Sequence, residues 1–227
     1  MHKISLPKNP LINIAGSSDQ FPIRRIFCVG KNYAAHVTEM GGDASKDTPI
    51  YFTKSAWSYI PSGSILEFPK GTNDLHHEIE LVIAIGKTGS DISVGEAAEH
   101  IYGYAAGIDL TRRDLQAAAK NNGNPWDLAK DFEGSALIGD ISTDMAHQLY
   151  QEGNILLEVN GEIRQSSNLN QMIWKIDEII ANLSQYYALE PGDLIMTGTP
   201  EGVSALNPGD HISGSITNIP PIQLTLK

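Results

Sequence analysis

Residues 75–86, LHHEIELVIAIG, constrain the fold most strongly, because an apolar run of strand length has two acidic residues at its start. From Ile79 to Ile85 the run is almost continuously apolar, which is typical of a strand that enters a core. Glu78 and Glu80 are two positions apart, so in a strand their side chains share a face, with Cβ atoms roughly 6.6 Å apart. The segment therefore predicts a core strand that carries two like charges side by side.

These two carboxylates need an explanation, because burying their charges is costly without compensation. At a strand end they can simply be hydrated, and for an isolated Glu-x-Glu that explanation is the commoner one. Otherwise one of them is protonated, a basic side chain pairs with them, or a cation lies between them.

A third acid favours the cation. The apolar stretch YGYAAGIDL runs into Asp109 shortly before a predicted helix, and such junctions often contribute functional side chains. Three carboxylates without a nearby cysteine would form an oxygen-ligand site for a hard cation: Mg²⁺, Mn²⁺ or Ca²⁺. His76 and His77 suggest zinc only weakly, because neighbours in a strand face opposite ways and at most one of them can join the two glutamates.

Three further segments contain side chains that could take part in chemistry. His36 and Glu39 lie three apart in a predicted helix, where they can act as a general base with its orienting carboxylate or form an ordinary exposed pair. Lys130, in WDLAKDFEG, is either solvated, as most lysines are, or part of a site. The stretch IMTGTPEGV can offer backbone N–H groups and a hydroxyl to an anion, or be an ordinary turn.

Charge and cysteine content exclude some classes of protein. The net charge of -11 argues against a nucleic-acid-binding surface, and it means that an anionic substrate requires a local positive centre such as a metal ion. The single cysteine, Cys28, excludes an internal disulfide and suits a reducing compartment. Because there is neither a signal-peptide pattern nor an apolar run near the ~20 residues that span a bilayer, we expect a cytoplasmic protein without membrane contacts.

Many short strands and few helices predict an α+β domain. The clearest local feature is NILLEVNGEIRQ (154–165), in which two alternating stretches flank Asn160-Gly161, the signal for a type I′ hairpin. Helices are predicted over 31–40, over 111–122 with a capping box of Thr111 and Asp114, and over 176–189. The last helix has an apolar stripe made of Ile176, Ile179, Ile180, Leu183 and Tyr187. No linker divides the chain, so we expect an N-terminal arm (1–22) and a single domain (23–227).

Five motifs, in this order along the chain, resemble the fumarylacetoacetate hydrolase family: CVGKNYAAH, HHEIEL, IDLTRRDLQ, LAKDFEG and GDLIMTGTPEGV. The similarity extends from about residue 23 onward and is strongest to the short acylpyruvase/oxaloacetate decarboxylase branch. The larger, original hydrolase has a fourth acidic ligand where this chain has Val29, which also favours the short branch. The resemblance implies a mixed β-roll with flanking short helices, commonly a homodimer.

The resemblance also implies roles for individual residues. Glu78, Glu80 and Asp109 match the family's three ligands for Mg²⁺ or Mn²⁺. His36 and Glu39 match a water-activating pair, in a segment that orders over the site like a lid. The residues that match positions near the substrate are Arg113 and Gln116, the site lysine Lys130, and Thr199, the threonine that holds the substrate carboxylate.

From these matches we expect a metal-dependent enzyme that cleaves a C–C bond of a small 2-oxo acid through a metal-stabilised enolate. The reaction would be hydrolysis of an acylpyruvate to pyruvate and a carboxylate, decarboxylation of oxaloacetate, or both. An alternative is isomerisation, tautomerisation or decarboxylation of unsaturated oxo-diacids in aromatic catabolism, as in other members of the family. A third possibility is a non-catalytic protein in which the ion only holds the strands together.

Overall fold

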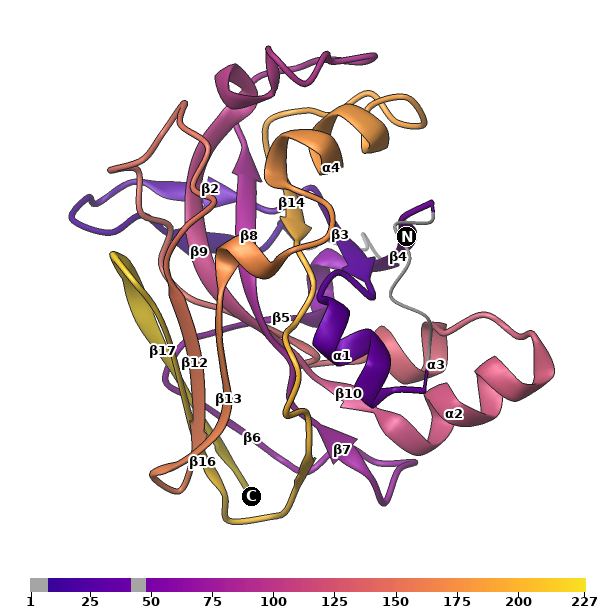
Figure 1. Cartoon of the computed structure of the whole chain (residues 1–227). Helices are drawn as coiled ribbons and strands as arrows, with labels where there is room; N and C mark the ends of the chain where they lie inside the picture. Colours follow the sequence, from indigo (N-terminus) through magenta and orange to yellow (C-terminus); the bar gives the residue numbers. More distant parts are fainter. Residues whose placement is uncertain (1–7, 42–47) are drawn as a thin grey trace, which may run out of the picture.

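A computed structural model describes residues 8–41 and 48–227, and within them a mixed seven-stranded sheet is the largest element (Figure 1). Its strand order is β4 (Ile50–Lys54), β3 (Arg25–Gly30), β14 (Asp193–Met196), β8 (Ile79–Ile85), β9 (Ile101–Asp109), β11 (Ala136–Ile138) and β5 (Tyr59–Pro61). The β3–β14 and β5–β11 pairs are parallel and the other pairs are antiparallel. β8 lies in the middle of the sheet with every residue buried, as its apolar run predicted.

A second sheet, of five described strands, packs across one face of the first. Its order is β13 (Glu162–Asn168), β12 (Asn154–Val159), β16 (His211–Ile216), β17 (Ile219–Leu226) and β6 (Ser64–Leu66). Between β12 and β13, Asn160 has a φ of 55° and Gly161 a φ of 80°, which confirms the predicted type I′ hairpin. β12, β16 and β17 contact β8 and β9, so the two sheets enclose a common core.

Smaller elements surround these sheets. β1 (Leu11–Asn13) pairs with β2 (Gln20–Pro22), and β7 (Leu75–His76) pairs with β10 (Thr111–Arg112) and β15 (Ala205–Leu206). The helices are α1 (Ala34–Glu39), α2 (Arg113–Asn122), α3 (Asp127–Lys130) and α4 (Ile176–Leu183), with 3₁₀ turns η1 (Ala56–Ser58), η2 (Ala97–His100) and η3 (Leu169–Gln171). None of these described helices is long and apolar enough to cross a membrane. The mixed sheets and short flanking helices confirm the predicted α+β fold.

The two faces of β8 pack against different partners. Leu81 and Ile83 face the second sheet and α4 in the larger hydrophobic core. Val82 faces a smaller core that includes the β1–β2 hairpin. Because side chains alternate along a strand, Glu78 and Glu80 lie on the Val82 face, beyond the end of that smaller core. An apolar strand can therefore be covered on both sides and still present two acids to a site at one end.

Two details of the predicted helices are wrong. α4 ends at Leu183, because the chain turns at Ser184, whose hydroxyl donates to the Ala181 carbonyl. Tyr187, predicted on the apolar stripe of that helix, therefore lies outside it and is 44% exposed. The capping box of Thr111 and Asp114 is also absent, because Thr111 belongs to β10 and its hydroxyl enters the candidate site.

The N-terminal end of the described chain packs against the rest of the domain. Residues 11–22 of the predicted arm form the β1–β2 hairpin, with Ile12 and Phe21 buried in the smaller core. Residues 1–7 lie outside the described residues. The division into an arm (1–22) and one domain (23–227) stays a prediction.

Candidate active site

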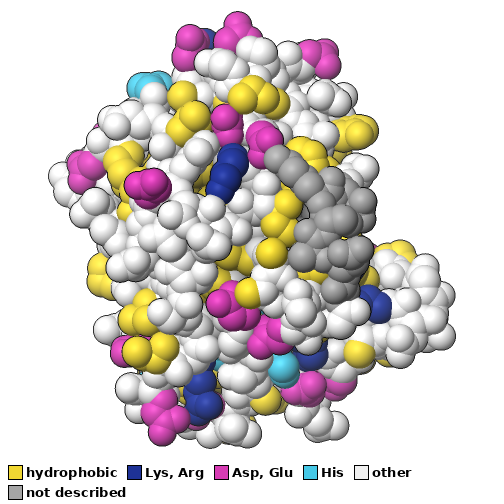
Figure 2. Space-filling model, in the orientation of Figure 1, with side chains coloured by type: hydrophobic (Ala, Val, Ile, Leu, Met, Phe, Trp, Pro, Cys, Tyr) yellow, Lys and Arg dark blue, Asp and Glu magenta, His cyan; other side chains and the backbone are white. Residues whose placement is uncertain are grey.

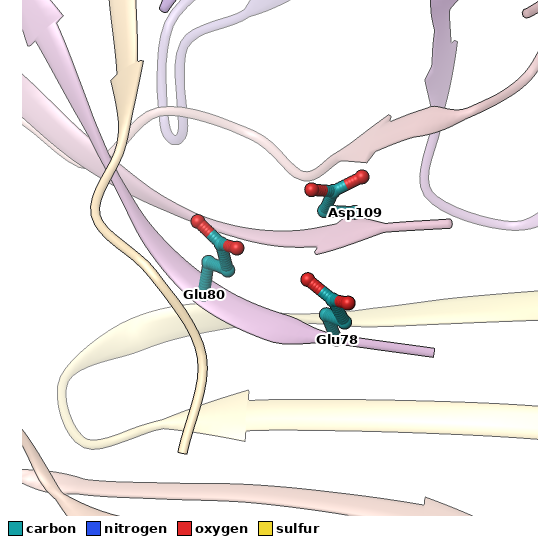
Figure 3. A group of neighbouring side chains, drawn as sticks. All are labelled: Glu78, Glu80 and Asp109. Atoms are coloured by element: carbon teal, nitrogen blue, oxygen red, sulfur yellow. The ribbon is translucent and has the colours of Figure 1, made fainter. Parts of the chain in front are cut away.

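Glu78, Glu80 and Asp109 form a buried cluster at the shared end of β8 and β9 (Figure 3). The antiparallel register pairs Ile79 with Ile108, so Asp109 comes opposite Glu78, and its N–H donates to the Glu78 carbonyl at 2.9 Å. Figure 3 shows the three carboxylates close together on the same side of β8 and β9. One oxygen of each lies within 4.8 Å of those of the other two, and the residues are at most 5% exposed. The structure therefore brings together the three acids that the sequence singled out.

Basic side chains compensate two of these three charges. Lys130 Nζ donates to Glu78 Oε2 at 2.8 Å and to Asp109 Oδ2 at 2.7 Å. The Arg113 guanidinium donates to the other oxygen of Glu78. Burial opposes ionisation of Glu78, but the charges of Lys130 and Arg113 prevail and hold its pKa well below its usual range. Burial alone would likewise lower the pKa of Lys130, but Asp109 and Glu78 raise it above its usual value.

Glu80 is different, because no basic side chain in the described part of the chain forms an ion pair with it. From residues 8–41 and 48–227, its Oε2 accepts a single hydrogen bond, from the backbone N–H of Gly198 at 2.7 Å. Burial and the charges of Asp109 and Glu78 raise the pKa of Glu80 well above its usual value. A buried carboxylate with two like neighbours and no cation is costly, so this position calls for positive charge.

The donor set fits a hard divalent cation. All three side chains offer carboxylate oxygens, which Mg²⁺ and Mn²⁺ prefer. Asp109 Oδ1 is buried and accepts no hydrogen bond within residues 8–41 and 48–227. An ion among the three carboxylates would compensate Glu80 and add a ligand contact to this oxygen, which accepts no hydrogen bond.

Lys54, at the end of β4, is a site residue that the sequence analysis missed. Its Nζ is fully buried and lies 2.8 Å from Asp109 Oδ1, at an angle that makes an ion pair but not a hydrogen bond. The ammonium group donates instead to the backbone carbonyls of Leu110 and Lys130. Lys54 therefore anchors the Asp109 carboxylate through the oxygen that Lys130 does not contact. Its segment, PIYFTK, contains no signal beyond a strand pattern.

Replacing this lysine tests the anchoring. We expect Lys54→Met to lower the unfolding free energy of the metal-free protein by about 3 kcal/mol, because Asp109 stays buried with less compensation. Added Mn²⁺ should restore part of the loss by supplying positive charge next to Asp109. Urea denaturation with and without chelator measures both effects. As a control, Lys87→Met removes an exposed lysine paired with Glu99 and should change stability by about 0.5 kcal/mol or less. Equal effects of the two substitutions would contradict the anchoring role.

His36 and Glu39 form the predicted pair on α1. His36 Nδ1 lies 3.2 Å from Glu39 Oε2, and the histidine is only 7% exposed. The Gly202 N–H also donates to both Glu39 oxygens, at 3.1 and 3.2 Å, so the carboxylate is held from two sides. As a carboxylate can only accept, Nδ1 carries a hydrogen, so in the neutral imidazole Nε2 has the lone pair.

One pocket contains most of the predicted site residues. Gln116 is oriented there by Arg113, whose Nη1 donates to Gln116 Oε1 at 2.5 Å. Four basic residues and two acidic ones line this pocket, although the chain as a whole is acidic. On the face shown in Figure 2, by contrast, basic side chains of the described residues are scattered among acidic ones. The lining residues are Val29, Gly30, Lys31, His36, Met40, Phe52, Glu78, Glu80, Arg113, Gln116, Lys120, Trp126, Lys130 and Thr199.

The two histidines that weakly suggested zinc do not join the acidic cluster. His76 Nε2 lies 2.9 Å from Asp74 Oδ1, and its Nδ1 lies 3.4 Å from Arg113 Nε. His77 projects to the opposite side, where it contacts Gln165 and Ser204. Burial lowers the pKa of His77 to about 4. Within residues 8–41 and 48–227, the acidic cluster contains no histidine.

Thr111 is a second site residue whose function the sequence did not reveal. Its hydroxyl accepts from Lys130 Nζ at 2.7 Å and lies 3.2 Å from Glu78 Oε1. Its position two residues after Asp109, within IDLTRRD, was the available signal, but a helix-cap pattern explained it equally well.

Comparison with known proteins agrees with this geometry. A family model described as "Fumarylacetoacetate (FAA) hydrolase C-terminal" matches residues 25–227. A fumarylpyruvate hydrolase from Ralstonia sp. is 50% identical over 184 residues, which cover 81% of this chain and 95% of that protein. A mitochondrial oxaloacetate tautomerase from Arabidopsis thaliana is 38% identical, covering 89% and 91%. A mitochondrial oxaloacetate decarboxylase from Dictyostelium discoideum is 39% identical, covering 86% and 90%.

A solved structure is similar over the whole chain. It is the crystal structure of a fumarylpyruvate hydrolase from Pseudomonas aeruginosa in complex with Mn²⁺ and pyruvate. The two chains are 42% identical and superpose with a TM-score of 0.95, covering 100% of this chain and 99% of the other.

Proposed function

The chain belongs to the fumarylacetoacetate hydrolase family, and we propose that it hydrolyses an acylpyruvate whose acyl group carries a second carboxylate, in a divalent-metal-dependent reaction. Cleavage of a C–C bond in a small 2-oxo acid is the activity that its relatives support. The observation that carries the proposal is Glu80, a buried carboxylate with no basic partner among the described residues, in a three-acid cluster whose two glutamates line a pocket with four basic residues.

Glu78, Glu80 and Asp109 would hold the Mg²⁺ or Mn²⁺ ion. When bound, the ion supplies a Lewis acid that attracts the oxygens of a 2-oxo acid and stabilises negative charge. Lys54, Lys130 and Arg113 keep the carboxylates in place and leave Glu80 for the ion.

Four side chains would bind the 2-oxo acid. Thr199 donates to its carboxylate, while Arg113 and Lys130 supply positive charge near the oxygens that become negative. Gln116, oriented by Arg113, adds a hydrogen bond. These groups lie on α2, α3 and the loop after β14, and they line the same pocket as Glu78 and Glu80.

His36 would activate the water. Nε2 takes a proton from the water while the water oxygen attacks the distal carbonyl of the acylpyruvate. Glu39 stabilises the imidazolium that forms. The bond between the distal carbonyl carbon and the adjacent methylene carbon then breaks. Its electron pair leaves with the pyruvate unit, which takes up a proton, and the other product is a carboxylic acid. Oxaloacetate needs no water, because loss of CO₂ leaves the same pyruvate unit.

A second negative charge on the substrate would suit the pocket wall. Lys31 and Lys120 line the pocket besides Arg113 and Lys130, and no described acid other than Glu78 and Glu80 lines it. Lys120 Nζ lies 5.4 Å from the centre of the Trp126 ring, and burial and the charge of Arg113 lower the pKa of Lys120. The Ralstonia relative is named a fumarylpyruvate hydrolase, and a fumaryl group has a terminal carboxylate that would supply this second negative charge.

Substitution of Lys120 tests this selectivity. We expect Lys120→Gln to raise KM for fumarylpyruvate about fivefold or more, and KM for acetylpyruvate, which has no distal carboxylate, less than about twofold. Steady-state kinetics on both substrates measures the ratio, and Lys87→Gln is the control at an exposed site. Equal changes for both substrates would remove Lys120 from substrate selection.

A second candidate activity is keto–enol tautomerisation of oxaloacetate, which the name of the Arabidopsis relative favours. It needs proton transfer but no attacking water. The His36–Glu39 pair, held by Gly202, supports hydrolysis more strongly because it is built to orient a general base.

One experiment separates these reactions. Purified Mn²⁺-loaded protein is assayed against fumarylpyruvate, acetylpyruvate, oxaloacetate and an unsaturated oxo-diacid, with product analysis. Pyruvate and a carboxylic acid from an acylpyruvate support the proposal. Isomers without chain cleavage would replace it by the isomerase or tautomerase function. If the protein neither turns over nor competitively binds any 2-oxo acid, the remaining interpretation is a non-catalytic protein in which the ion only holds the strands together.

A homodimer, a cytoplasmic location and the lack of nucleic-acid or membrane partners stay predictions. Sedimentation analysis of the purified protein would test the first of them.

A further inference from the structure

Gln165, in β13, is a fully buried glutamine whose amide makes four hydrogen-bonding contacts. Its Oε1 accepts from Ile79 N–H at 3.1 Å and lies 2.9 Å from His77 Nδ1. Its Nε2 donates to Thr199 Oγ1 at 2.8 Å and to the Pro200 carbonyl at 2.9 Å. Gln165 does not line the pocket, and it reaches the site through Thr199 and through the backbone of Ile79, between Glu78 and Glu80.

The orientation of this amide is determined by its backbone partners. The N–H of Ile79 can only donate, so it must meet the amide oxygen of Gln165. The carbonyl of Pro200 can only accept, so it must meet the amide nitrogen. The reversed amide would lose both bonds. The group next to Thr199 is therefore a donor.

The polarity of Thr199 follows from this orientation. Because Gln165 Nε2 donates to it, Thr199 Oγ1 is an acceptor in that bond, and its own hydrogen must point elsewhere. Within the described residues the hydroxyl donates to no other group, and Thr199 lines the pocket. The free direction for its hydrogen is thus toward a ligand in the pocket.

His77 extends the same polarity. Gln165 Oε1 is an acceptor, so His77 Nδ1 carries a hydrogen and donates to it. Each group from His77 through Gln165 to Thr199 then donates in one direction, toward the pocket. Hydrogen bonds aligned in this way strengthen one another.

We propose that Gln165 is a positioning residue that fixes the Thr199 hydroxyl as a donor, so that this corner of the pocket selects an acceptor oxygen such as the carboxylate of the 2-oxo acid. This inference rests on the proposed function, in which Thr199 binds that carboxylate. Gln165 does not touch the substrate and acts through Thr199.

Two substitutions of Gln165 change the polarity in different ways. Gln165→Glu keeps the acceptor for Ile79 and His77 but replaces the donor by a second acceptor, so the Thr199 hydrogen turns away from the pocket. Gln165→Met removes the donor without adding charge and leaves the hydroxyl free to rotate. We expect KM for fumarylpyruvate and the inhibition constant of pyruvate to rise about 10- to 100-fold in Gln165→Glu and less in Gln165→Met, with smaller changes in kcat.

A double-mutant cycle with Thr199→Val separates this role from a structural one. Most of the Gln165 effect should vanish in the Thr199→Val background, because there is no hydroxyl left to orient. The effect that persists in the Gln165→Glu, Thr199→Val protein measures the added charge alone. Gln171→Glu, the same change at an exposed glutamine, should alter KM less than about twofold. If Gln165→Glu does not fold, as its unfolding transition will reveal, the cycle with Gln165→Met carries the test.

The outcomes distinguish this inference from the proposed function. If the Mn²⁺-loaded wild-type protein neither cleaves fumarylpyruvate nor binds pyruvate, the proposed function fails and the inference with it. If the wild-type protein is active but the Gln165 effect is absent, or is equal with and without the Thr199 hydroxyl, the positioning role is overturned and the proposed function stands.

Discussion

Glu80→Gln is expected to lower kcat/KM for the 2-oxo acid about 1,000-fold or more, while the metal-free protein remains as stable as the wild type. The substitution removes one of three charged oxygen ligands, and ligand charge is a main determinant of affinity for hard cations. Stability is preserved because burial and two neighbouring carboxylates raise the pKa of Glu80, so that the neutral amide resembles its favoured protonated form. The amide oxygen can still accept from Gly198 N–H.

Unfolding measurements report the loss of metal directly. An ion that binds only the folded state adds RT ln(1 + [L]/Kd) to the unfolding free energy. At an Mn²⁺ concentration about 100 times the wild-type Kd, this is about 2.7 kcal/mol. If the loss of one carboxylate weakens binding about 100-fold, the same concentration stabilises the variant by only about 0.4 kcal/mol.

The control for Glu80→Gln is Glu158→Gln, the same change on the second sheet, where Glu158 accepts from Ser213 Oγ at 3.3 Å. That protein should respond to Mn²⁺ as the wild type does. If Mn²⁺ stabilises Glu80→Gln as much as it stabilises the wild type, Glu80 is not a ligand. If Glu80→Gln loses as much unfolding free energy without metal as with Mn²⁺, the substitution damages the fold rather than the site.

Parity along a single strand was enough to predict that Glu78 and Glu80 share a face, whereas Asp109 was added from its position before a predicted helix and from the family resemblance. Alternation places Glu78 and Glu80 on one face of β8, and the strand that ends at Asp109 turned out to be its antiparallel neighbour. The register then brings Asp109 opposite Glu78. The hairpin at Asn160-Gly161 was predictable for a similar reason, since its φ angles depend on two adjacent residues.

Lys54 and Gln165 were not predictable, because their partners are distant in sequence. Lys54 reaches Asp109 from β4, which three strands separate from β9 in the sheet order, and Gln165 reaches Thr199 from the second sheet. In their own segments a strand lysine and a hairpin glutamine have no distinguishing pattern. Thr111 was misassigned for a related reason: a threonine before a helix forms a cap unless tertiary contacts engage its hydroxyl, and here Lys130 does so.

His36→Ala is expected to lower the rate of acylpyruvate hydrolysis by about 10²- to 10⁴-fold, the usual contribution of a general base, while oxaloacetate decarboxylation falls about tenfold or less. Only hydrolysis requires an activated water. Mn²⁺ binding should be unchanged, because His36 is not among the groups that would hold the ion. Parallel assays of both reactions on the metal-loaded variant measure the difference, and free imidazole, which fits the space left by the ring, should restore part of the hydrolysis.

Glu39 makes this prediction more specific. The Gly202 N–H holds the Glu39 carboxylate independently of His36, so Glu39 stays in place when the imidazole is removed. Glu39→Gln should therefore lower hydrolysis less than His36→Ala does, and should add little in the His36→Ala background, because an orienting group has no effect without the base that it orients. Equal losses of hydrolysis and decarboxylation in His36→Ala would remove the water-activating role. The histidine would then bind substrate, since a binding contact contributes to both reactions alike.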